Sequence, residues 1–254
     1  MNKITRFIPF GKKNLMKNTK YILTIIIPTY NSNRYIVKNL KKLMKLLKLN
    51  FTKYNIIVVD DKSEDNTVAL IRKNFKSIDL ICNKINSGKG FCIKKALKFS
   101  TKSKYYIFID DDLPYLKHFK LLCKNVLSSK YDLVVAHRQN KINHLNINIK
   151  IRKIFSTLIN LITRKIFLIP YRDTQAGLKG FNNLYANNFK KIITNRFLFD
   201  LELFLICIKK NARIKTIFVK SEKKNYNLSL IYSLKIYISV VNDLVTIYKK
   251  YIKN

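Results

Sequence analysis

Short apolar runs rich in Ile, Val, Tyr and Phe alternate with amphipathic stretches through the first half of the chain. Nearly continuous apolar runs are typical of parallel strands that are buried on both faces. The strands expected from them cover residues 21–30, 54–59, 78–82 and 105–109. Between these strands apolar side chains recur at helical spacing, and the expected helices cover residues 34–49, 67–75 and 91–99. This alternation predicts an α/β domain, a Rossmann-like and mostly parallel sheet flanked by helices.

The pattern in the second half is less regular. Further strands are expected at residues 131–136 and 214–219, and an apolar helix at 199–208. Segment 147–170 is apolar and basic, and as a helix it would either lie in a membrane interface or pack on the core. Two of the five glycines fall within residues 172–181, which predicts a tight functional loop there.

The chain divides into three expected parts. Residues 1–20 read as a basic arm that lacks the features of a signal peptide. Residues 21–222 carry the strand–helix alternation and are expected to form the main domain. Residues 223–254 are expected to form an amphipathic, basic helical tail. Because no run of about 18 uncharged apolar residues occurs, we expect no transmembrane helix.

Charge narrows the choice of partners. Lys and Arg number 51 against 14 Asp and Glu, which gives a net charge of +37. The joint abundance of Lys, Asn and Ile suggests an AT-rich genome, which would account for part of this excess. The charge still attracts anionic lipid, nucleic acid and phosphorylated ligands. The four Cys form no CxxC pair and the three His show no zinc spacing, so we expect free thiols and no zinc site.

Three consecutive carboxylates, Asp110, Asp111 and Asp112, follow the fourth expected strand. Because side chains alternate along a strand, Asp110 and Asp112 share a direction and Asp111 points the other way. Two carboxylates on one side, without His or Cys, suit Mg²⁺ or Mn²⁺, hard cations that also bind phosphates. A solvated acidic turn is the alternative explanation of this tripeptide taken alone.

Polar residues also end the first two strands, with Tyr30 after the first and Asp60 and Asp61 after the second. Ligands of parallel α/β sheets bind at the carboxyl ends of the strands. The three strand ends together therefore predict a nucleotide site. The Gly-Lys-Gly of residues 88–90 begins a helix, where backbone N–H groups and an ammonium can meet an anion. A plain glycine turn explains that tripeptide equally well.

As a set, these motifs resemble the family 2 glycosyltransferases of the GT-A fold. The four general motifs are IIIPTYN (25–31), IIVVDDKSEDNT (56–67), NSGKG (86–90) and IFIDDDL (107–113). Two further motifs, RDTQAGLKGF (172–181) and FDLELF (199–204), are similar to the polyprenyl-phosphate branch, which contains the dolichyl-phosphate glucose and mannose synthases. The pattern DTQ-x-G looks nearest to the dolichyl-phosphate β-glucosyltransferases.

The resemblance implies a role for each matching residue. The nucleotide sugar would be bound by Pro28, Thr29, Tyr30, Asn31, Asp60, Asp61, Lys89, Asp110 and Asp111. Asp110 and Asp112 would hold Mg²⁺ or Mn²⁺. The catalytic residues would be Asp112, Arg138, Arg152, Asp173, Gln175 and Glu202, with Gly177 and Asp200 supporting the sugar and acceptor side.

The implied activity is inverting transfer of a hexose from a nucleotide sugar, with UDP-glucose favoured, to a polyprenyl or dolichyl phosphate at the cytoplasmic face of the membrane. A phosphate acceptor has a second pKa of about 6, so it is already a nucleophile near neutral pH and needs no dedicated general base. The enzyme would associate peripherally with the anionic membrane surface.

Three other functions would account for some of the same features of the sequence. A family 2 transferase could use GDP-mannose, or a soluble or lipopolysaccharide-type glycan as acceptor. A nucleotidyltransferase also uses paired carboxylates with Mg²⁺, but residues 28–31 are not the Gly-rich loop typical of that class. A nucleic-acid-binding protein would explain the charge, yet the chain shows no signature of the common binding modules.

Overall fold

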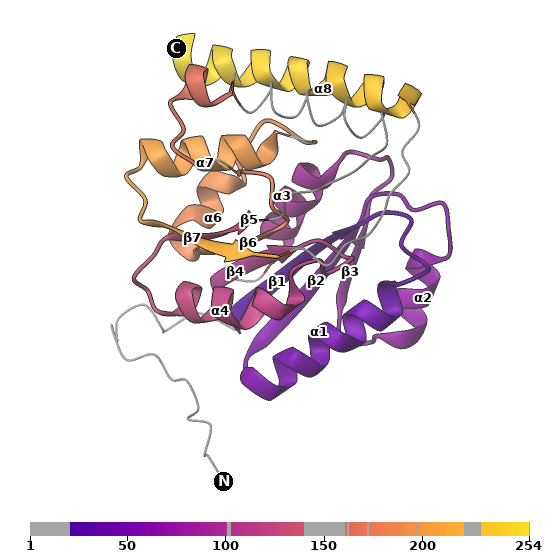
Figure 1. Cartoon of the computed structure of the whole chain (residues 1–254). Helices are drawn as coiled ribbons and strands as arrows, with labels where there is room; N and C mark the ends of the chain where they lie inside the picture. Colours follow the sequence, from indigo (N-terminus) through magenta and orange to yellow (C-terminus); the bar gives the residue numbers. More distant parts are fainter. Residues whose placement is uncertain are drawn as a thin grey trace.

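The computed structural model describes residues 21–100, 103–139, 161, 163–171, 173–196, 198–220 and 230–253. Within these residues one seven-stranded sheet, with the order β3-β2-β1-β4-β6-β5-β7, runs through the molecule (Figure 1). The predicted arm over residues 1–20 lies outside the described residues. So do Arg152 and most of the 147–170 segment, so that their roles stay predictions.

The first half of the sheet is parallel, as the apolar runs predicted. Its strands are β1 (Tyr21–Thr29), β2 (Tyr54–Asp60), β3 (Asp79–Cys82) and β4 (Ser103–Ile109). The crossover helices between them are α1 (Ile36–Asn50), α2 (Thr67–Asn74) and α3 (Lys89–Phe99). The strands are apolar on both faces because helices cover the sheet on each side. The predicted fold class is therefore confirmed.

The second half is mixed. Strand β6 (Leu178–Asn182) runs antiparallel to both of its neighbours, β4 and β5 (Leu133–Arg138), and β5 pairs in parallel with β7 (Ile214–Val219). The sequence predicted a tight loop over residues 172–181, which is wrong for its last four residues. Those residues are central strand, and Gly180 is required there by packing. A Cβ at Gly180 would lie 2.5 Å from the Val126 side chain.

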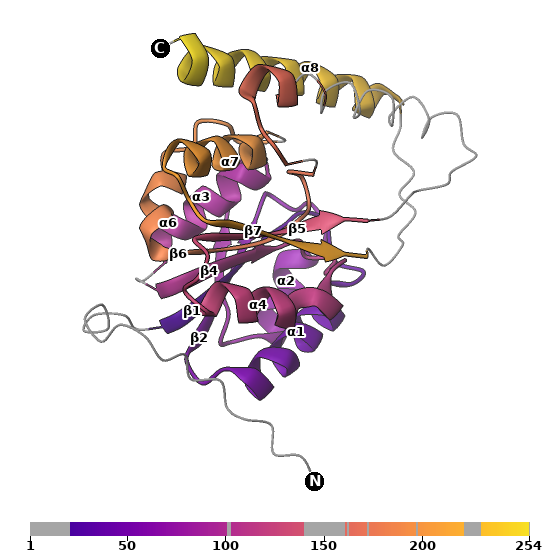
Figure 2. The ribbon, with the colours of Figure 1, turned by 60° about the vertical axis from the view of Figure 1, so that its left-hand side comes forward.

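Helices form one layer on each face of the sheet (Figure 2). Helices α1, α2 and α4 (Phe119–Leu127), the last preceded by the short helix η2 (Leu116–His118), share one apolar core. Helices α3, α6 (Asn183–Phe189) and α7 (Phe199–Lys209) share the other.

The C-terminal helix α8 (Leu230–Tyr248) continues into one π-helical turn, η3 (Lys249–Lys253). In both views α8 lies beyond α7, on the side of the second helix layer (Figures 1 and 2). Val240 and Ile247 are buried in the core of that layer, so the helix packs on the main domain. None of the described helices combines the length and the apolar character that crossing a bilayer requires.

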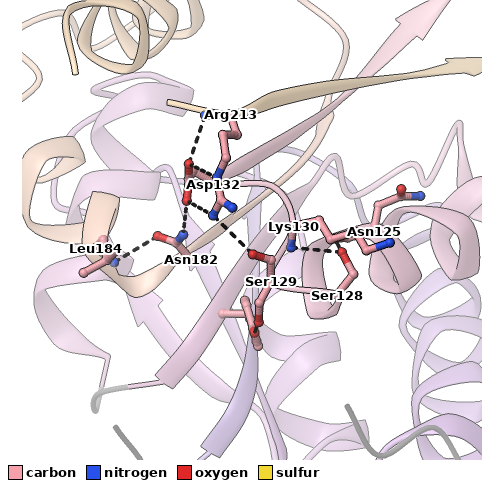
Figure 3. Close-up of polar contacts among 9 residues, drawn as sticks. Asn125, Ser128, Ser129, Lys130, Asp132, Asn182, Leu184 and Arg213 are labelled. Carbon is pink, nitrogen blue, oxygen red and sulfur yellow. Dashed lines mark hydrogen bonds and ion pairs between the residues drawn. The ribbon is translucent and has the colours of Figure 1, made fainter. Parts of the chain in front are cut away.

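A polar cluster joins three strands and a helix at one end of the second half of the sheet (Figure 3). The Asp132 carboxylate, just before β5, accepts hydrogen bonds from the backbone N–H and the guanidinium of Arg213, which precedes β7, at 2.9 to 3.0 Å. It also accepts one at 2.9 Å from Asn182, the last residue of β6. Asn182 in turn caps α6 by accepting from the N–H of Leu184. We call these residues the Asp132 clamp.

Candidate active site

The carboxyl ends of β1, β2 and β4 meet at one edge of the sheet, as the polar residues after each strand predicted. In the β1–β2 register Thr29 lies opposite Asp60, and the Asp61 N–H donates to the Thr29 carbonyl at 2.9 Å. The Thr29 hydroxyl donates to Asp111, after β4, at 2.7 Å. Residues from three strands thus converge within hydrogen-bonding distance.

Asp60 and Asp61 are both buried, and each shapes a loop. The Asp60 carboxylate accepts from the N–H and hydroxyl of Ser63 at 2.9 and 2.5 Å, which fixes the turn after β2. The Asp61 carboxylate accepts from Asn83 and from the N–H groups of Ser87 and Gly88, at 2.7 to 2.9 Å. Asp61 therefore holds the start of the Gly-Lys-Gly turn.

The residues that follow β1 lie at the surface of this edge. Tyr30 is 44% exposed, which leaves its ring open to a ligand. Asn31 adopts φ of 50° and its side-chain oxygen accepts from the Glu64 N–H at 2.9 Å. Pro28 is half-buried within β1. The left-handed backbone at Asn31 turns the chain away from the strand and presents Tyr30 beside the Asp60 loop.

The Asp111 carboxylate has other partners than that of Asp110. Strand β4 ends at Ile109 and the Leu113 N–H donates to the Asp110 carbonyl at 3.0 Å, so the three carboxylates lie in a turn and the alternation expected of a strand does not extend to them. The Asp111 carboxylate accepts hydrogen bonds from Thr29 and Ser32, and Asn39 of α1 donates to the Asp111 carbonyl at 2.9 Å. Burial raises the pKa of this carboxyl to about 6, although the two hydroxyls oppose the shift. The Asp111 side chain is thus turned to β1 and α1 and ties the strand ends together, and its expected part in nucleotide binding stays a prediction.

Asp110 is held from two sides. The Lys89 ammonium, at the start of α3, lies 2.5 Å from Asp110 Oδ1. On the other side, Gly177 packs directly against the Asp110 carboxylate. A Cβ at position 177 would lie 1.6 Å from Asp110 Oδ2, so no residue larger than glycine fits there. Burial lowers the pKa of Lys89, but the carboxylates of Asp110 and Asp200 outweigh it and the pKa is raised. Lys89 is therefore a charged cation beside Asp110, the first carboxylate of the pair Asp110 and Asp112, which we call the DxD pair.

A second ion pair lies buried beneath the first. Lys179 of β6 donates to Asp200 of α7 at 2.6 Å and to the Ala176 carbonyl at 2.7 Å, and its side chain is fully buried. Both the Lys179 and Lys89 ammoniums lie over the Phe108 ring, at 5.3 and 5.7 Å from its centroid. Sequence analysis missed Lys179. The available signal was a lysine between apolar residues and glycines in LKGF.

Arg138 and Asp173 form a fork at the end of β5. The Arg138 Nε and Nη2 atoms lie 2.8 and 2.7 Å from the two Asp173 oxygens, and the Arg138 N–H donates to the same carboxylate. The Gln175 N–H adds a further bond to Asp173 at 3.1 Å. Burial opposes ionisation of Asp173, but the hydrogen bonds and charge of Arg138 hold its pKa below the usual value. Nearly half of the Arg138 side chain stays exposed.

The start of β6 brings the fork close to the DxD pair. The ends of β4 and β5 flank the start of β6 on its two sides. The Asp110 N–H donates to the Gly177 carbonyl at 3.0 Å, four residues after Asp173. The Arg138–Asp173 fork and the DxD pair therefore lie at one edge of the sheet. Tyr115, which sequence analysis did not single out, is buried, and its burial raises its pKa.

Glu202 has a different place from the one expected. Its side chain is fully buried and accepts hydrogen bonds from Ile193, Thr194, Lys250 and Tyr251. All of these donors belong to the fold itself, so the contacts of Glu202 in this structure are structural, and the expected catalytic role stays a prediction.

The DxD pair fits a divalent cation only together with phosphate oxygens. No group of three His, Cys, Asp or Glu side chains able to hold a metal occurs among the residues whose positions the structure gives. Mg²⁺ is commonly held by one or two carboxylates and completed by the substrate's phosphates and water. Asp110 and the half-buried Asp112 supply such a pair of hard oxygen ligands. The donors present are therefore suited to a metal–nucleotide complex.

Comparison with known proteins decides the family. The profile described as glycosyl transferase family 2 matches residues 24–193, which include the strand ends, the DxD pair and the Arg138–Asp173 fork. The chain belongs to this family. It is a glycosyltransferase, which confirms the class predicted from the motifs.

The relatives of this glycosyltransferase include enzymes of the predicted branch. An uncharacterised protein of Methanocaldococcus jannaschii is 30% identical over 223 residues, 83% of this chain and 93% of the relative. The dolichyl-phosphate β-glucosyltransferase of Saccharomyces cerevisiae is 25% identical over 219 residues, 77% of this chain. This match spans 65% of the yeast protein. The Dictyostelium discoideum enzyme of the same name is also 25% identical, over 215 residues, 78% of this chain and 65% of that protein.

Solved structures share the fold at low sequence identity. Mannosyl-3-phosphoglycerate synthase of Rubrobacter xylanophilus superposes with a TM-score of 0.68 at 14% identity, covering 91% of this chain and 74% of that one. Glucosyl-3-phosphoglycerate synthase of Mycobacterium tuberculosis, in complex with Mn²⁺, UDP and glucosyl-3-phosphoglycerate, gives 0.67 at 13% identity, covering 91% and 80%. These likenesses bear on the fold alone.

Proposed function

We propose that this glycosyltransferase moves a hexose from a nucleotide sugar, with UDP-glucose favoured over GDP-mannose, to a polyprenyl phosphate. The observation that carries the proposal is the short connection between the DxD pair and the Arg138–Asp173 fork. Gly177, four residues after Asp173, packs against Asp110, and the ends of β4 and β5 flank the start of β6. Carboxylates suited to a metal–diphosphate would thus lie near a half-exposed arginine suited to a second phosphate. The named dolichyl-phosphate β-glucosyltransferases among the relatives support the choice of acceptor.

The donor would bind across the ends of β1, β2 and β4. The exposed Tyr30 ring would stack on the base, and the Asp60 loop would lie beside it. Asp110 and Asp112 would hold Mg²⁺ or Mn²⁺, which when bound would neutralise the diphosphate and improve it as a leaving group. Lys89 adds a fixed positive charge at the same point.

The acceptor phosphate would bind at Arg138. Asp173 holds the guanidinium through two of its nitrogens and so fixes its direction, while the exposed remainder faces the site. An ionised phosphate attacks without a general base, because it already carries the negative charge of a nucleophile near neutral pH. A single displacement at the anomeric carbon inverts its configuration.

A lipid acceptor requires the enzyme to work at a membrane surface. The outer side of α8 and η3 exposes Val241, Val245, Tyr248 and Ile252 beside Lys249 and Lys253. An amphipathic helix with apolar and basic residues on its outer side binds anionic bilayers in the plane of the interface. We therefore propose peripheral association with the cytoplasmic face of a membrane, through this surface.

The test is transfer of radiolabelled hexose into an organic-extractable product. The enzyme is incubated with Mn²⁺ and either UDP-glucose or GDP-mannose, and with polyprenyl phosphate, 3-phosphoglycerate or no acceptor. We expect label in the lipid phase from UDP-glucose with polyprenyl phosphate alone. Label transferred to 3-phosphoglycerate, or to no acceptor other than water, would contradict the lipid acceptor. Transfer from GDP-mannose alone would contradict the donor.

A further inference from the structure

The segment of residues 192–196, which we call the strap, crosses from α6 to α7 and contacts the Gly-Lys-Gly turn on its way. The Phe91 N–H, in the first turn of α3, donates to the Asn195 carbonyl at 3.0 Å. Lys94 donates to the Asn195 side chain at 2.5 Å and to the Ile192 carbonyl at 2.8 Å. Arg196 donates to the Asn86 carbonyl at 3.0 Å. The strap therefore fixes both ends of the turn that carries Lys89.

Both glycines of the turn are explained by this contact. A Cβ at Gly90 would lie 2.6 Å from the Phe199 Cβ and 2.9 Å from the Asn195 carbonyl oxygen. A Cβ at Gly88, which has φ of 95°, would lie 2.7 Å from the Arg196 Cγ and from the same oxygen. The sequence left two explanations of Gly-Lys-Gly open, anion binding or a plain turn. Close approach of the strap is a third, and it accounts for both positions.

Glu202 holds the strap from the opposite side. One carboxylate oxygen accepts from the N–H groups of Ile193 and Thr194, both at 3.0 Å, and from the Thr194 hydroxyl at 2.9 Å. The other accepts from Lys250 at 2.8 Å and from the Tyr251 hydroxyl at 2.9 Å. A buried carboxylate is costly unless donors surround it, and here strap and C-terminal turn supply the donors together.

We propose that Glu202 is a positioning residue for the donor site, and that the C-terminal turn η3 acts on that site through it. The path runs from Lys250 and Tyr251 to Glu202, through the strap, to the turn that presents Lys89 to Asp110. The inference rests on the proposed nucleotide-sugar site, because the loop it positions lines that site. It gives the C-terminal turn a part in donor binding in addition to any part in membrane contact.

The first test compares Glu202→Gln with Asp132→Asn. Both remove a carboxylate that joins several elements, fully buried at Glu202 and 13% exposed at Asp132. The hydrogen bonds of Asp132 go to Asn182 and Arg213, outside the strap. UDP binding is measured by calorimetry with Mn²⁺, well below the melting temperature of every variant. We expect Glu202→Gln to bind UDP at least about tenfold more weakly, since misplacement by about 1 Å can cost about a hundredfold. Asp132→Asn should bind like the wild type.

Three further variants keep the test decisive if Glu202→Gln is too unstable to measure. Tyr251→Phe and Lys250→Met each remove one donor at the C-terminal end and should weaken UDP binding in the same direction. Gly90→Ala pushes the strap from the loop side and should do so as well. Gly90 and Glu202 act through one strap. The double variant Gly90→Ala/Tyr251→Phe should therefore lose less UDP-binding free energy than the sum of the two single losses.

A readout without metal or nucleotide accompanies the binding data. Amide hydrogen exchange over residues 86–92 should be faster in Tyr251→Phe than in the wild type, and unchanged in Asp132→Asn. UDP affinity and exchange at wild-type levels in all the strap variants would overturn the inference. A wild-type protein that binds no nucleotide at all would instead overturn the proposed function on which the inference rests.

Discussion

Lys179 and Asp200 form an ion pair that water does not reach, with side chains 0% and 4% exposed. Burial alone lowers the pKa of the lysine and raises that of the aspartate. Each charge is stabilised by the other at 2.6 Å, and the Ala176 carbonyl accepts a further bond. Each of these two buried charges therefore remains ionised only because its partner is present.

The losses of stability from removing the two members of this pair should not add. We expect Lys179→Met to lower the free energy of unfolding by about 3–5 kcal/mol, because it leaves Asp200 buried without a partner. The double variant Lys179→Met/Asp200→Asn should lose less than the sum of the single losses. Urea unfolding followed by circular dichroism measures all three, with Lys41→Met, on the exposed side of α1, as control. Additive losses would show that the two charges are not coupled.

Sequence reasoning anticipated some side chains and not others for one physical reason. The position of Asp110, Asp111 and Asp112 at a strand end was anticipated, because the apolar run before them is a local pattern. Their directions could not be, because β4 ends at Ile109 and the three carboxylates lie in a turn. Lys179 was missed because burial of a lysine depends on a carboxylate 21 residues away on another element. Glu202 was given a catalytic role because its motif was visible, whereas its donors at residues 250 and 251 were not.

The elements of the second half depend on one another through the Asp132 clamp (Figure 3). Folding lowers the pKa of Asp132. The hydrogen bonds from Arg213 are the largest cause of this shift, and burial of the carboxyl acts in the opposite direction. The carboxylate thereby links the starts of β5 and β7 to the end of β6 and the first turn of α6. These elements are the ones whose sequence pattern was weakest.

The clamp predicts a pH-dependent loss of stability in Asp132→Asn. Because folding lowers the pKa of Asp132, its stabilisation is complete above the unfolded value of 3.8 and is lost as the pH falls through the folded value. We expect the variant to be less stable than the wild type by about 1–3 kcal/mol at pH 7. The difference should shrink on acidification below about pH 4. Denaturant unfolding at both pH values measures it, and a difference independent of pH would contradict the assignment to the ionised carboxylate.

Elements could be predicted where local pattern and burial agree. Strands β1, β2 and β4 are mostly apolar because both of their faces are covered, so their apolar runs could be recognised in the sequence. Strand β6 reads as a loop because Lys179 and Gly180 interrupt its apolar pattern, and both residues are explained only by neighbours distant in sequence. Helix α6 follows it without a break and was not foreseen.

The whole molecule carries a net charge of +37. For binding to a surface, the positions of the basic residues matter more than their number. Basic residues on α1 and on the C-terminal turn lie on opposite sides of the sheet, since α1 and α8 pack in different cores. The C-terminal surface combines the exposed Lys249 and Lys253 with the exposed stripe of Val241, Val245 and Tyr248.

Binding to anionic vesicles should therefore depend on which lysines are removed. We expect Lys249→Gln/Lys253→Gln to weaken partitioning by roughly thirtyfold, since each lysine near an anionic surface contributes about 1 kcal/mol. The matched control, Lys41→Gln/Lys45→Gln on α1, should bind nearly as the wild type does. Vesicle sedimentation at physiological salt measures both pairs. Equal weakening of vesicle binding by the two double variants would mean that binding depends on total charge and not on the position of the lysines.

Calorimetric titration with UDP, with and without Mn²⁺, would decide whether the donor site is real. On the proposal made above, the ends of β1, β2 and β4 form a metal-dependent nucleotide site around Asp110 and Asp112. We therefore expect Mn²⁺ to tighten UDP binding in the wild type and in Asp132→Asn. In Asp112→Asn the metal-dependent gain should fall by at least about tenfold, the usual cost of disturbing a metal site. An undiminished Mn²⁺-dependent gain in Asp112→Asn would contradict the account.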